Sequence, residues 1–244
     1  MRGGRAPPQR LSAPGASPDD LPQAARTALE RVVALVASEA RAPSSVRDPR
    51  EAWRVHIADS LSGLEVEGLR EARSITDVGA GAGFPGLPLA VALPKARVDL
   101  IEATTRKCEF IERAIAAAGV DNARVVCGRA EEWARAEPTD GGREAYETVT
   151  ARAVGRLATL AELASPLLID GGVLVAWKGR RDAEEESEME RVGARMAMER
   201  EDVRWVGPYA GSRNRHIHVL RKRGPTPAEL PRRPGLAKKR PLGT

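Results

Sequence analysis

Apolar residues near the N-terminus recur at the spacing of an amphipathic helix. Between Pro22 and Arg41 they lie three or four residues apart, at Ala25, Leu29, Val32, Val33 and Val36. This spacing places them on one helix face, which can pack against a core. A second helix is expected after Asp48, where Pro49 suits the first turn. Its apolar face would carry Trp53, Ile57 and Leu61. We therefore expect a small helical cap over residues 22–72.

From residue 73 onward the pattern changes to short β-branched runs that alternate with helical stretches. The runs are SITDVGA, ARVDLIEA, ARVVCG, YETVTARA and GGVLVAWKG. Helices are expected between them, at about residues 86–93, 104–118, 129–136 and 156–168. This alternation predicts an α/β, Rossmann-like fold, in which crossover helices cover a parallel sheet and ligands bind at the carboxyl ends of the strands.

The second half of this domain has a different pattern. A charged helix is expected from about Arg180 to Glu201. Two further strands are expected near residues 202–206 and 215–221, and they would give the sheet an antiparallel end. The sheet domain would then span residues 73–223.

The two ends of the chain have compositions that do not favour a packed core. Residues 1–21 are rich in Pro, Gly, Ser and Arg, so we expect them to be disordered. Beyond Arg223, prolines and basic residues predict an extended tail over residues 224–244. From Arg221 to Thr244 there are eight cations and one anion, so this end carries +7 and the rest of the chain −2. Such a tail is typical of polyanion-binding proteins, although a merely solvated tail has the same composition.

The remaining composition limits the class of protein. The 244 residues allow one substantial core. Cys108 and Cys127 are too few for a disulfide framework and lie in no CxxC pair, so a reducing cytoplasm is expected. His56, His216 and His218 lack neighbours at zinc-site spacing, and we predict no metal site. No stretch approaches the roughly 20 apolar residues of a membrane span, and the N-terminus lacks a signal-peptide core.

The most informative segment is a glycine-rich loop between the first predicted strand and the next helix. It reads DVGAGAGFPG from Asp77 to Gly86. Alternate glycines remove every Cβ from a tight turn, so a ligand can approach the backbone closely. Phe84 would either cover a ligand or pack under the helix. Glu102 ends the following strand, where an ionised carboxylate can accept hydrogen bonds from ribose hydroxyls.

Two nucleotide cofactors fit this loop. Gly81, Gly83 and Gly86 satisfy the GxGxxG dinucleotide pattern, so an NAD-dependent oxidoreductase is one alternative. The position of the loop relative to the strand favours S-adenosylmethionine. Gly79 follows the strand immediately, whereas a dinucleotide loop that begins at Gly81 would start late. The predicted cofactor-binding residues of the loop and the following strand are Asp77, Gly79, Gly81, Gly83, Phe84 and Glu102.

Six segments occur in a fixed order along the chain. They are RDPREAWRVHIADSL, DVGAGAGFPGLPLA, GRAEEWA, TARAVGRLATLAELASPLL, GGVLVAWKG and ELPRRPGLAKKRPLG. Together they resemble the bacterial small-subunit rRNA guanine-N7 methyltransferases, the glucose-inhibited-division protein B type, over about residues 47–244. The resemblance implies a class I S-adenosylmethionine-dependent methyltransferase fold. It also implies an enzyme that methylates N7 of a loop guanine in the 530-loop region of 16S rRNA, either free or in the 30S subunit. We expect this enzyme to be a cytoplasmic monomer.

The resemblance also implies site residues, position by position. Gly79 and Phe84 would line the cofactor. Ala130 and Glu131 would border its adenine, and Arg152 would complete the site. Taken alone, Glu131 could be only a helix N-terminal charge and Arg152 a surface ion pair. The chain departs from the family before the RDP segment, where it reads SEARAPSSV instead of an Asn-rich turn, so no N-terminal RNA contact is carried over.

Guanine N7 is an unprotonated acceptor at neutral pH, so its methylation needs no general base. We expect the rate acceleration to come mainly from positioning of the reacting atoms, which can lower the activation barrier by about 7 to 11 kcal/mol. We expect Arg129, Arg152 and Lys178, near strand ends, to grip phosphate or the guanine O6 edge, whereas Arg156 could equally be a solvated cation. The N7 edge of A-form RNA lies in a deep, narrow groove, so the target must be looped out. A non-catalytic RNA-binding module with this fold is the other alternative.

Overall fold

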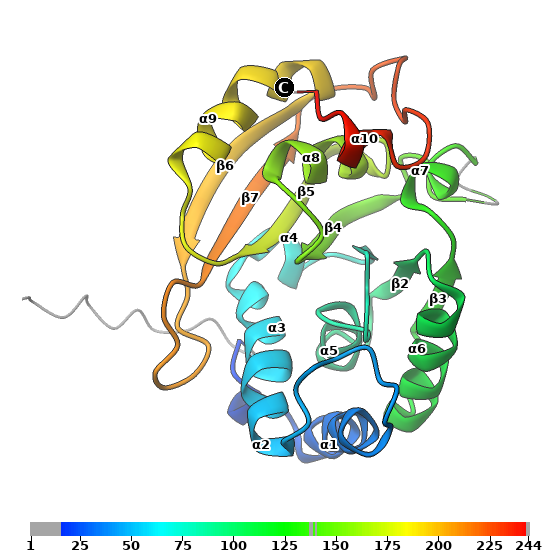
Figure 1. The fold of residues 1–244 in the computed structure, drawn as a ribbon, viewed down its shortest axis with the longest axis vertical. Coiled ribbons are helices and arrows are strands. Elements are labelled where there is room, and N and C mark those ends of the chain that lie inside the picture. Colours follow the sequence, from blue (N-terminus) through cyan, green and yellow to red (C-terminus); the bar gives the residue numbers. More distant parts are fainter. Residues whose placement is uncertain (1–15, 137–138, 140, 243–244) are drawn as a thin grey trace, which may run out of the picture.

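The computed structural model describes residues 16–136, 139 and 141–242 of the chain. Its centre is a seven-stranded sheet with the strand order β3-β2-β1-β4-β5-β7-β6 (Figure 1). The strands are β1 (Ser74–Val78), β2 (Arg97–Glu102), β3 (Ala123–Cys127), β4 (Tyr146–Arg152), β5 (Leu168–Lys178), β6 (Met198–Trp205) and β7 (His216–Lys222). Strands β1 to β5 pair in parallel, and β7 and β6 add an antiparallel end. The α/β architecture that the alternating pattern predicts is confirmed.

Helices cover both faces of this sheet. The longer ones are α1 (Gln23–Ser38), α5 (Gly86–Ala92), α6 (Thr105–Ala118), α8 (Leu157–Ala164) and α9 (Ala183–Val192), and the short α7 (Ala130–Trp133) and α10 (Leu236–Lys239) accompany them. One core joins α1, α5 and α6 to the sheet and the other joins α8 and α9 to it. In β5, Val173 and Val175 face the first core and Leu174 and Ala176 the second, because successive strand side chains point to opposite faces.

The second helix of the N-terminal cap begins where the sequence predicts. Asp48 caps it, with its carboxylate accepting a hydrogen bond from the Glu51 N–H at 2.8 Å. The helix runs through α2 (Pro49–Ala52), a π-helical turn (Trp53–Ala58) and α3 (Asp59–Leu61), and a 3-10 turn (Ser62–Glu65) and α4 (Glu67–Arg70) follow. Ile57 and Leu61 are fully buried, as expected for its apolar face. π-helical turns often mark functional positions, and this one lies beside the site described below.

The predicted disordered segment, residues 1–21, extends too far. Residues 1–15 lie outside the described residues. Residues 16–21 form a 3-10 turn (Pro18–Asp20) that Ser17 caps through its side chain. Ala16 and Leu21 are buried against the core. Composition averaged over the segment hides this, because two small apolar residues are enough to dock a short turn.

The predicted extended tail, residues 224–244, is also corrected as far as the structure describes it. Leu230 and Ala237 are buried in the domain. Arg232 donates two hydrogen bonds to the buried carboxylate of Glu162, at 2.6 and 2.5 Å. Pro-rich, basic composition predicts a solvated chain, but this segment docks through a few buried anchors. It passes α7, turns back through α10 and continues toward α9, near which the C mark lies (Figure 1).

The predicted charged helix ends earlier than the sequence indicates. Helix α9 stops at Val192, a 3-10 turn follows, and β6 begins at Met198 rather than near residue 202. At Gly193 a Cβ would lie 2.3 Å from the carbonyl oxygen of Met198, so the reversal requires glycine there. Ala197 completes the turn at φ +52°. Charged residues are frequent both in α9 and in the first half of β6, which is why charge patterning did not reveal the boundary.

The fold brings the two cysteines together. Cys108 of α6 and Cys127 of β3 form a disulfide, with Cα atoms 5.8 Å apart. Because α6 packs beside β3, positions far apart in sequence become neighbours. None of the helices in the described part of the chain combines the length and hydropathy that a bilayer span requires.

The burial of His218 predicts a contribution to the free energy of unfolding that depends on pH. Burial lowers its pKa to about 4, which the nearby Glu186 opposes and Lys178 and Arg181 assist. Since this is below the unfolded value of about 6.5, the native state binds fewer protons between these pH values, and stability is lost as pH falls through them. Between pH 7 and 5, wild type should lose about 1 to 2 kcal/mol more unfolding free energy than His218→Gln, by urea denaturation. Equal losses would contradict this assignment.

Candidate active site

The loop after β1 holds three glycines in the left-handed region of backbone space. Their φ angles are +72° at Gly79, +62° at Gly81 and +91° at Gly83, where side chains with a Cβ are disfavoured. At Gly79 a Cβ would also lie 2.7 Å from Cγ2 of Val154. The Gly79 N–H donates to the carbonyl of Ile101 at 2.9 Å, so the turn starts directly at the end of β1.

Beside this loop lies a cleft of about 340 Å³ at the carboxyl ends of β1 to β4, which we call the cofactor cleft. Sequence-predicted residues that line it are Gly79, Glu102, Arg129, Ala130 and Glu131. Its other walls come from the ends of β1 and β2, the start of α6, the residues after β4, α8 and the C-terminal segment. The cleft is therefore at the position where a sheet of this type binds ligands.

The carboxylate of Glu102 is held in place at the tip of β2. It is buried, its Oε2 accepts a hydrogen bond from the Gly81 N–H at 3.1 Å, and its Oε1 accepts one from the Thr104 N–H at 2.9 Å. Lys107 lies 3.8 Å from Oε2. An ionised carboxylate has about four acceptor positions, so Glu102 retains capacity for ribose hydroxyls.

Asp77 lies beneath the glycine loop rather than in the cleft. Its carboxylate accepts hydrogen bonds from the Gly86 N–H and the Thr150 hydroxyl, both at 2.9 Å. Complete burial raises the pKa of Asp77 to about 7, against the effect of these two bonds. Gly83 likewise faces Leu87 rather than the cleft. Asp77 and Gly83 are absent from the lining of the cofactor cleft and shape the loop, so their role in cofactor binding stays a prediction.

Phe84 is also outside the cofactor cleft, packed in the core. Its ring stacks on the imidazole of His56, with centroids 4.5 Å apart and planes within 7°. The guanidinium of Arg152 lies over the same ring at 5.8 Å. Burial, and then the charge of Arg152, lower the pKa of His56 to about 4, so this imidazole is neutral at neutral pH.

A second cavity, of about 230 Å³, adjoins the first, and we call it the acceptor cavity. It is lined by Asp59, Arg152, Ala153, Gly155, Trp177, Lys178, Gly179, Val206, Arg215 and His216. Ala153 lines both cavities and has φ +59°, in the left-handed region although it is not glycine. Strained residues of this kind cluster at ligand sites, where the surrounding structure enforces them.

Arg152 is fixed by the π-helical segment of the cap. Its Nη1 donates to Oδ2 of Asp59 at 2.9 Å and to the carbonyl of Val55 at 3.2 Å. Asp59 is itself buried, and its carbonyl accepts a hydrogen bond from the Trp177 indole N–H at 2.7 Å. The geometry places the Arg152 side chain in the acceptor cavity, whereas the resemblance implied the cofactor site.

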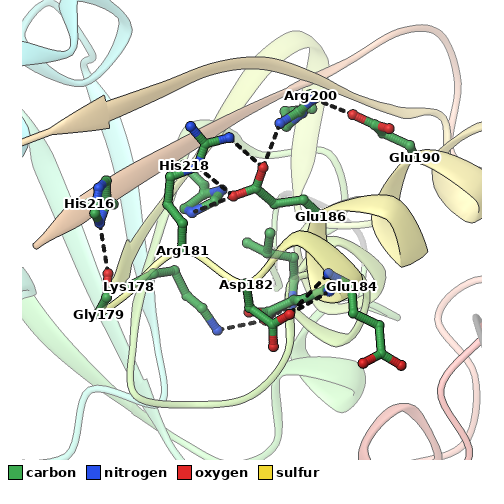
Figure 2. A network of polar contacts seen from close by, with 12 residues as sticks. Lys178, Gly179, Arg181, Asp182, Glu184, Glu186, Glu190, Arg200, His216 and His218 are labelled. Atoms are coloured by element: carbon green, nitrogen blue, oxygen red, sulfur yellow. Dashed lines mark hydrogen bonds and ion pairs between the residues drawn. The ribbon is translucent and has the colours of Figure 1, made fainter. Parts of the chain in front are cut away.

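Lys178 is fixed by the acidic helix α9. Its Nζ donates to Glu185 at 2.7 Å and to the carbonyl of Gly155 at 3.0 Å. In Figure 2, Lys178 points toward this helix, and the carboxylate of Glu186 lies between Arg181 and Arg200, at 2.6 and 2.9 Å. The charged helix predicted from the sequence therefore anchors the cations next to the acceptor cavity.

The other predicted cations do not share this cavity. Arg129 is exposed at the cofactor cleft. Arg156 forms an ion pair with Glu188 at 2.7 Å and lines neither cavity. Of the residues predicted to grip the substrate, only Arg152 and Lys178 are brought together. The sequence analysis missed Asp59, Trp177 and Arg215, although the first two lie in segments that carry the family resemblance.

Comparison with known proteins identifies the family. The GidB model, described as rRNA small subunit methyltransferase G, matches residues 30–217. The chain belongs to this family. It is 39% identical to ribosomal RNA small subunit methyltransferase G of Pelotomaculum thermopropionicum, over 82% of each chain. It is 40% identical to the methyltransferase G of Rubrobacter xylanophilus, over 88% of this chain and 82% of that one.

Solved structures that resemble this methyltransferase G family member agree with it in fold. The Methanococcus jannaschii fibrillarin pre-rRNA processing protein aligns with a TM-score of 0.52 at 19% identity, over 68% of this chain and 74% of that one. MtNAS in complex with S-adenosylmethionine aligns with a TM-score of 0.51 at 13% identity, over 82% and 73%. The predicted class I methyltransferase fold and enzyme class are confirmed, and the oxidoreductase and non-catalytic alternatives are set aside.

The residues of the cofactor cleft fit S-adenosylmethionine, the cofactor that the family uses. Gly79 lines the cleft with its backbone, and Val154 packs where a Cβ would lie, so no side chain of residue 79 separates a ligand from this backbone. The fixed acceptor of Glu102 lines the same cleft beside the glycine loop and is suited to ribose hydroxyls. A nucleoside can therefore be recognised here by close backbone approach and a carboxylate.

Proposed function

We propose that this chain transfers the methyl group of S-adenosylmethionine to N7 of a looped guanine in 16S rRNA, free or within the 30S subunit, and acts as a monomer. One observation carries the proposal: a donor-rich acceptor cavity opens beside the cofactor cleft, and Ala153 forms the boundary between them. The relatives are ribosomal RNA small subunit methyltransferases G, which supports RNA as the substrate class.

The charge of the acceptor cavity fits the guanine edge that carries N7. That edge presents two acceptors, N7 and O6. Arg152, Lys178 and Arg215 bring N–H donors to the cavity, and the carboxylate of Asp59 is already paired with Arg152. Donors from these cations can bind O6 or a neighbouring phosphate, which leaves the N7 lone pair free for reaction.

When bound, S-adenosylmethionine supplies an electrophilic methyl group on a positively charged sulfur. The chain's own residues then act by orientation. Gly79 and Glu102 fix the nucleoside part, and Arg152 and Lys178 fix the base. Since N7 carries no proton at neutral pH, none of these side chains must remove one. Orientation of this kind can supply about 7 to 11 kcal/mol.

The proposal is tested by methyl transfer to ribosomal substrates. The protein is incubated with methyl-tritiated S-adenosylmethionine and either naked 16S rRNA or 30S subunits, both isolated from cells that lack this modification. Label is expected in 16S rRNA, and cleavage chemistry selective for N7-methylguanine should cut at one site. Label confined to protein or small molecules would reject the proposal. Label at a nitrogen other than N7 would keep the enzyme class and reject the target atom.

A further inference from the structure

The last described part of the chain, residues 225–242, returns to the cofactor cleft, and we call it the C-terminal strap. In Figure 1 it follows β7 and crosses the side of the molecule that carries α8 and α7. The matched family region ends at residue 217, so the strap lies beyond it. The strap nevertheless contributes Gly235, Ala237 and Lys238 to the lining of the cofactor cleft.

The strap is anchored at its beginning by a buried lysine. Lys222 is fully buried, and its Nζ donates to Glu144 at 2.8 Å, to the carbonyl of Leu168 at 2.6 Å and to the Thr226 hydroxyl at 2.7 Å. Hydrogen bonds from Lys222 and Thr226 hold the pKa of Glu144 down at about 2, against the effect of burial. These hydrogen bonds fix the point where the strap leaves the sheet.

The middle of the strap is anchored on α8. Arg232 donates two hydrogen bonds to Glu162, a carboxylate that is only 3% exposed. A bidentate arginine–carboxylate pair is geometrically specific, and breaking it would leave a buried carboxylate without its partner. The Thr159 hydroxyl, also on α8, donates to the carbonyl of Ala237 at 3.4 Å. The path of the strap across α8 is therefore determined by side chains rather than by the chain end alone.

The strap also contacts a residue predicted to border the adenine. The Gly235 N–H donates to Oε1 of Glu131 at 2.6 Å. Glu131 is largely buried and lines the cofactor cleft from α7. Gly235 adopts φ +77°, and a Cβ there would meet nothing within 4 Å, so its conformation rather than its size is required. The hydrogen bond joins the strap to the wall that faces the nucleoside.

We propose that the strap is part of the cofactor-binding site: residues 235–238 close the outer side of the cofactor cleft and contribute to the affinity for the adenosyl group. This rests on the proposed use of S-adenosylmethionine in that cleft. Removing the strap segment exposes the cleft to water and frees the Glu131 carboxylate. Both changes weaken binding of a nucleoside that is otherwise enclosed.

The test is calorimetric binding of S-adenosylhomocysteine to the full chain and to a chain that ends at Arg233. This truncation keeps Leu230 and Arg232, so the Arg232–Glu162 anchor on α8 remains and, of the hydrogen bonds to that helix, only the Thr159–Ala237 contact is lost. The dissociation constant is expected to rise at least about tenfold in the truncated chain. Unchanged affinity there, beside normal binding by the full chain, overturns the strap proposal alone. No binding by the full chain would overturn the proposed function and the strap proposal with it.

A matched pair of point variants distinguishes the contribution of the cleft lining from a general effect of positive charge on the strap. Lys238 and Lys239 are both exposed, but only Lys238 lines the cleft. Because the aliphatic stem of a lysine covers surface, Lys238→Ala is expected to raise the dissociation constant roughly threefold, and Lys239→Ala to leave it unchanged. Equal effects in both variants would count against the proposal.

A measurement on the unmodified protein covers the case in which a variant does not fold. Trypsin can cleave after Lys238 and Lys239, both of which lie on the strap. If the strap closes over the cofactor, S-adenosylhomocysteine should slow cleavage at these two positions at least about fivefold, because cleavage requires local opening. NADH is the control ligand and should not slow it. An unchanged cleavage rate at saturating S-adenosylhomocysteine overturns the proposal.

Discussion

Gly79→Val is expected to abolish binding of S-adenosylhomocysteine, with a loss of roughly 100-fold or more. Gly79 adopts φ +72°, and a Cβ there would lie 2.7 Å from Cγ2 of Val154. A branched side chain therefore has to displace the turn that lines the cofactor cleft. Isothermal titration with the folded variant measures the effect, and circular dichroism monitors folding.

Gly171→Val is the matched control for this substitution. Gly171 has φ +76°, nearly the same as Gly79, but nothing lies within 4 Å of its Cβ position and it is outside the cleft. The control shares the backbone strain of about 1 to 2 kcal/mol and should keep its affinity. Full affinity in Gly79→Val would mean that the nucleoside binds elsewhere. Lost affinity in both variants would attribute the effect to destabilised folding.

The sheet and the cofactor loop were predictable because both have local signatures. Period-two runs and the spacing of the helices locate the strands, and alternate glycines after β1 have few uses other than close ligand approach. Glu102 followed from the same logic, since a carboxylate at the end of the second strand lies beside that loop. These inferences depend on residues close in sequence, which is why they agree with the structure.

The acceptor cavity was only partly predictable because distant segments build it. Asp59 comes from the cap, Trp177 from β5 and Arg215 from the end of the β6–β7 connection. They meet because β4, β5 and β7 are neighbours in the sheet and the cap packs beside them. No spacing rule relates such positions within one sequence. The cations Arg152 and Lys178 could be nominated from strand ends, but their carboxylate partners could not.

The C-terminal segment shows how composition can mislead. Its prolines and cations predict a solvated arm for RNA, and deleting it would then spare the cofactor. The packing of Ala237 and the Gly235–Glu131 hydrogen bond predict instead that the same deletion weakens cofactor binding. Docking depends on a few specific contacts, which average composition does not detect.

Arg152→Lys is expected to lower kcat for rRNA methylation roughly 100-fold while the affinity for S-adenosylhomocysteine stays within about threefold. Arg152 lies in the acceptor cavity, and its planar fork supplies several oriented donors, which a lysine ammonium cannot replace. Lysine keeps a cation near Asp59. Removing the charge altogether would leave this buried carboxylate with only the more distant Arg215 guanidinium, 3.9 Å from its other oxygen.

Arg156→Lys is the matched control, because Arg156 is an ion-paired arginine of the same region that lines neither cavity. Its kcat should stay within about twofold of wild type, since exposed pairs contribute little. The resemblance to the family implied that Arg152 belongs to the cofactor site, whereas its contacts with Asp59 and Val55 assign it to the acceptor side. A role in cofactor binding and a role on the acceptor side predict different effects of Arg152→Lys on the dissociation constant. If Arg152→Lys raises the dissociation constant for S-adenosylhomocysteine as much as it lowers kcat, Arg152 binds the cofactor and the division between the two cavities is wrong.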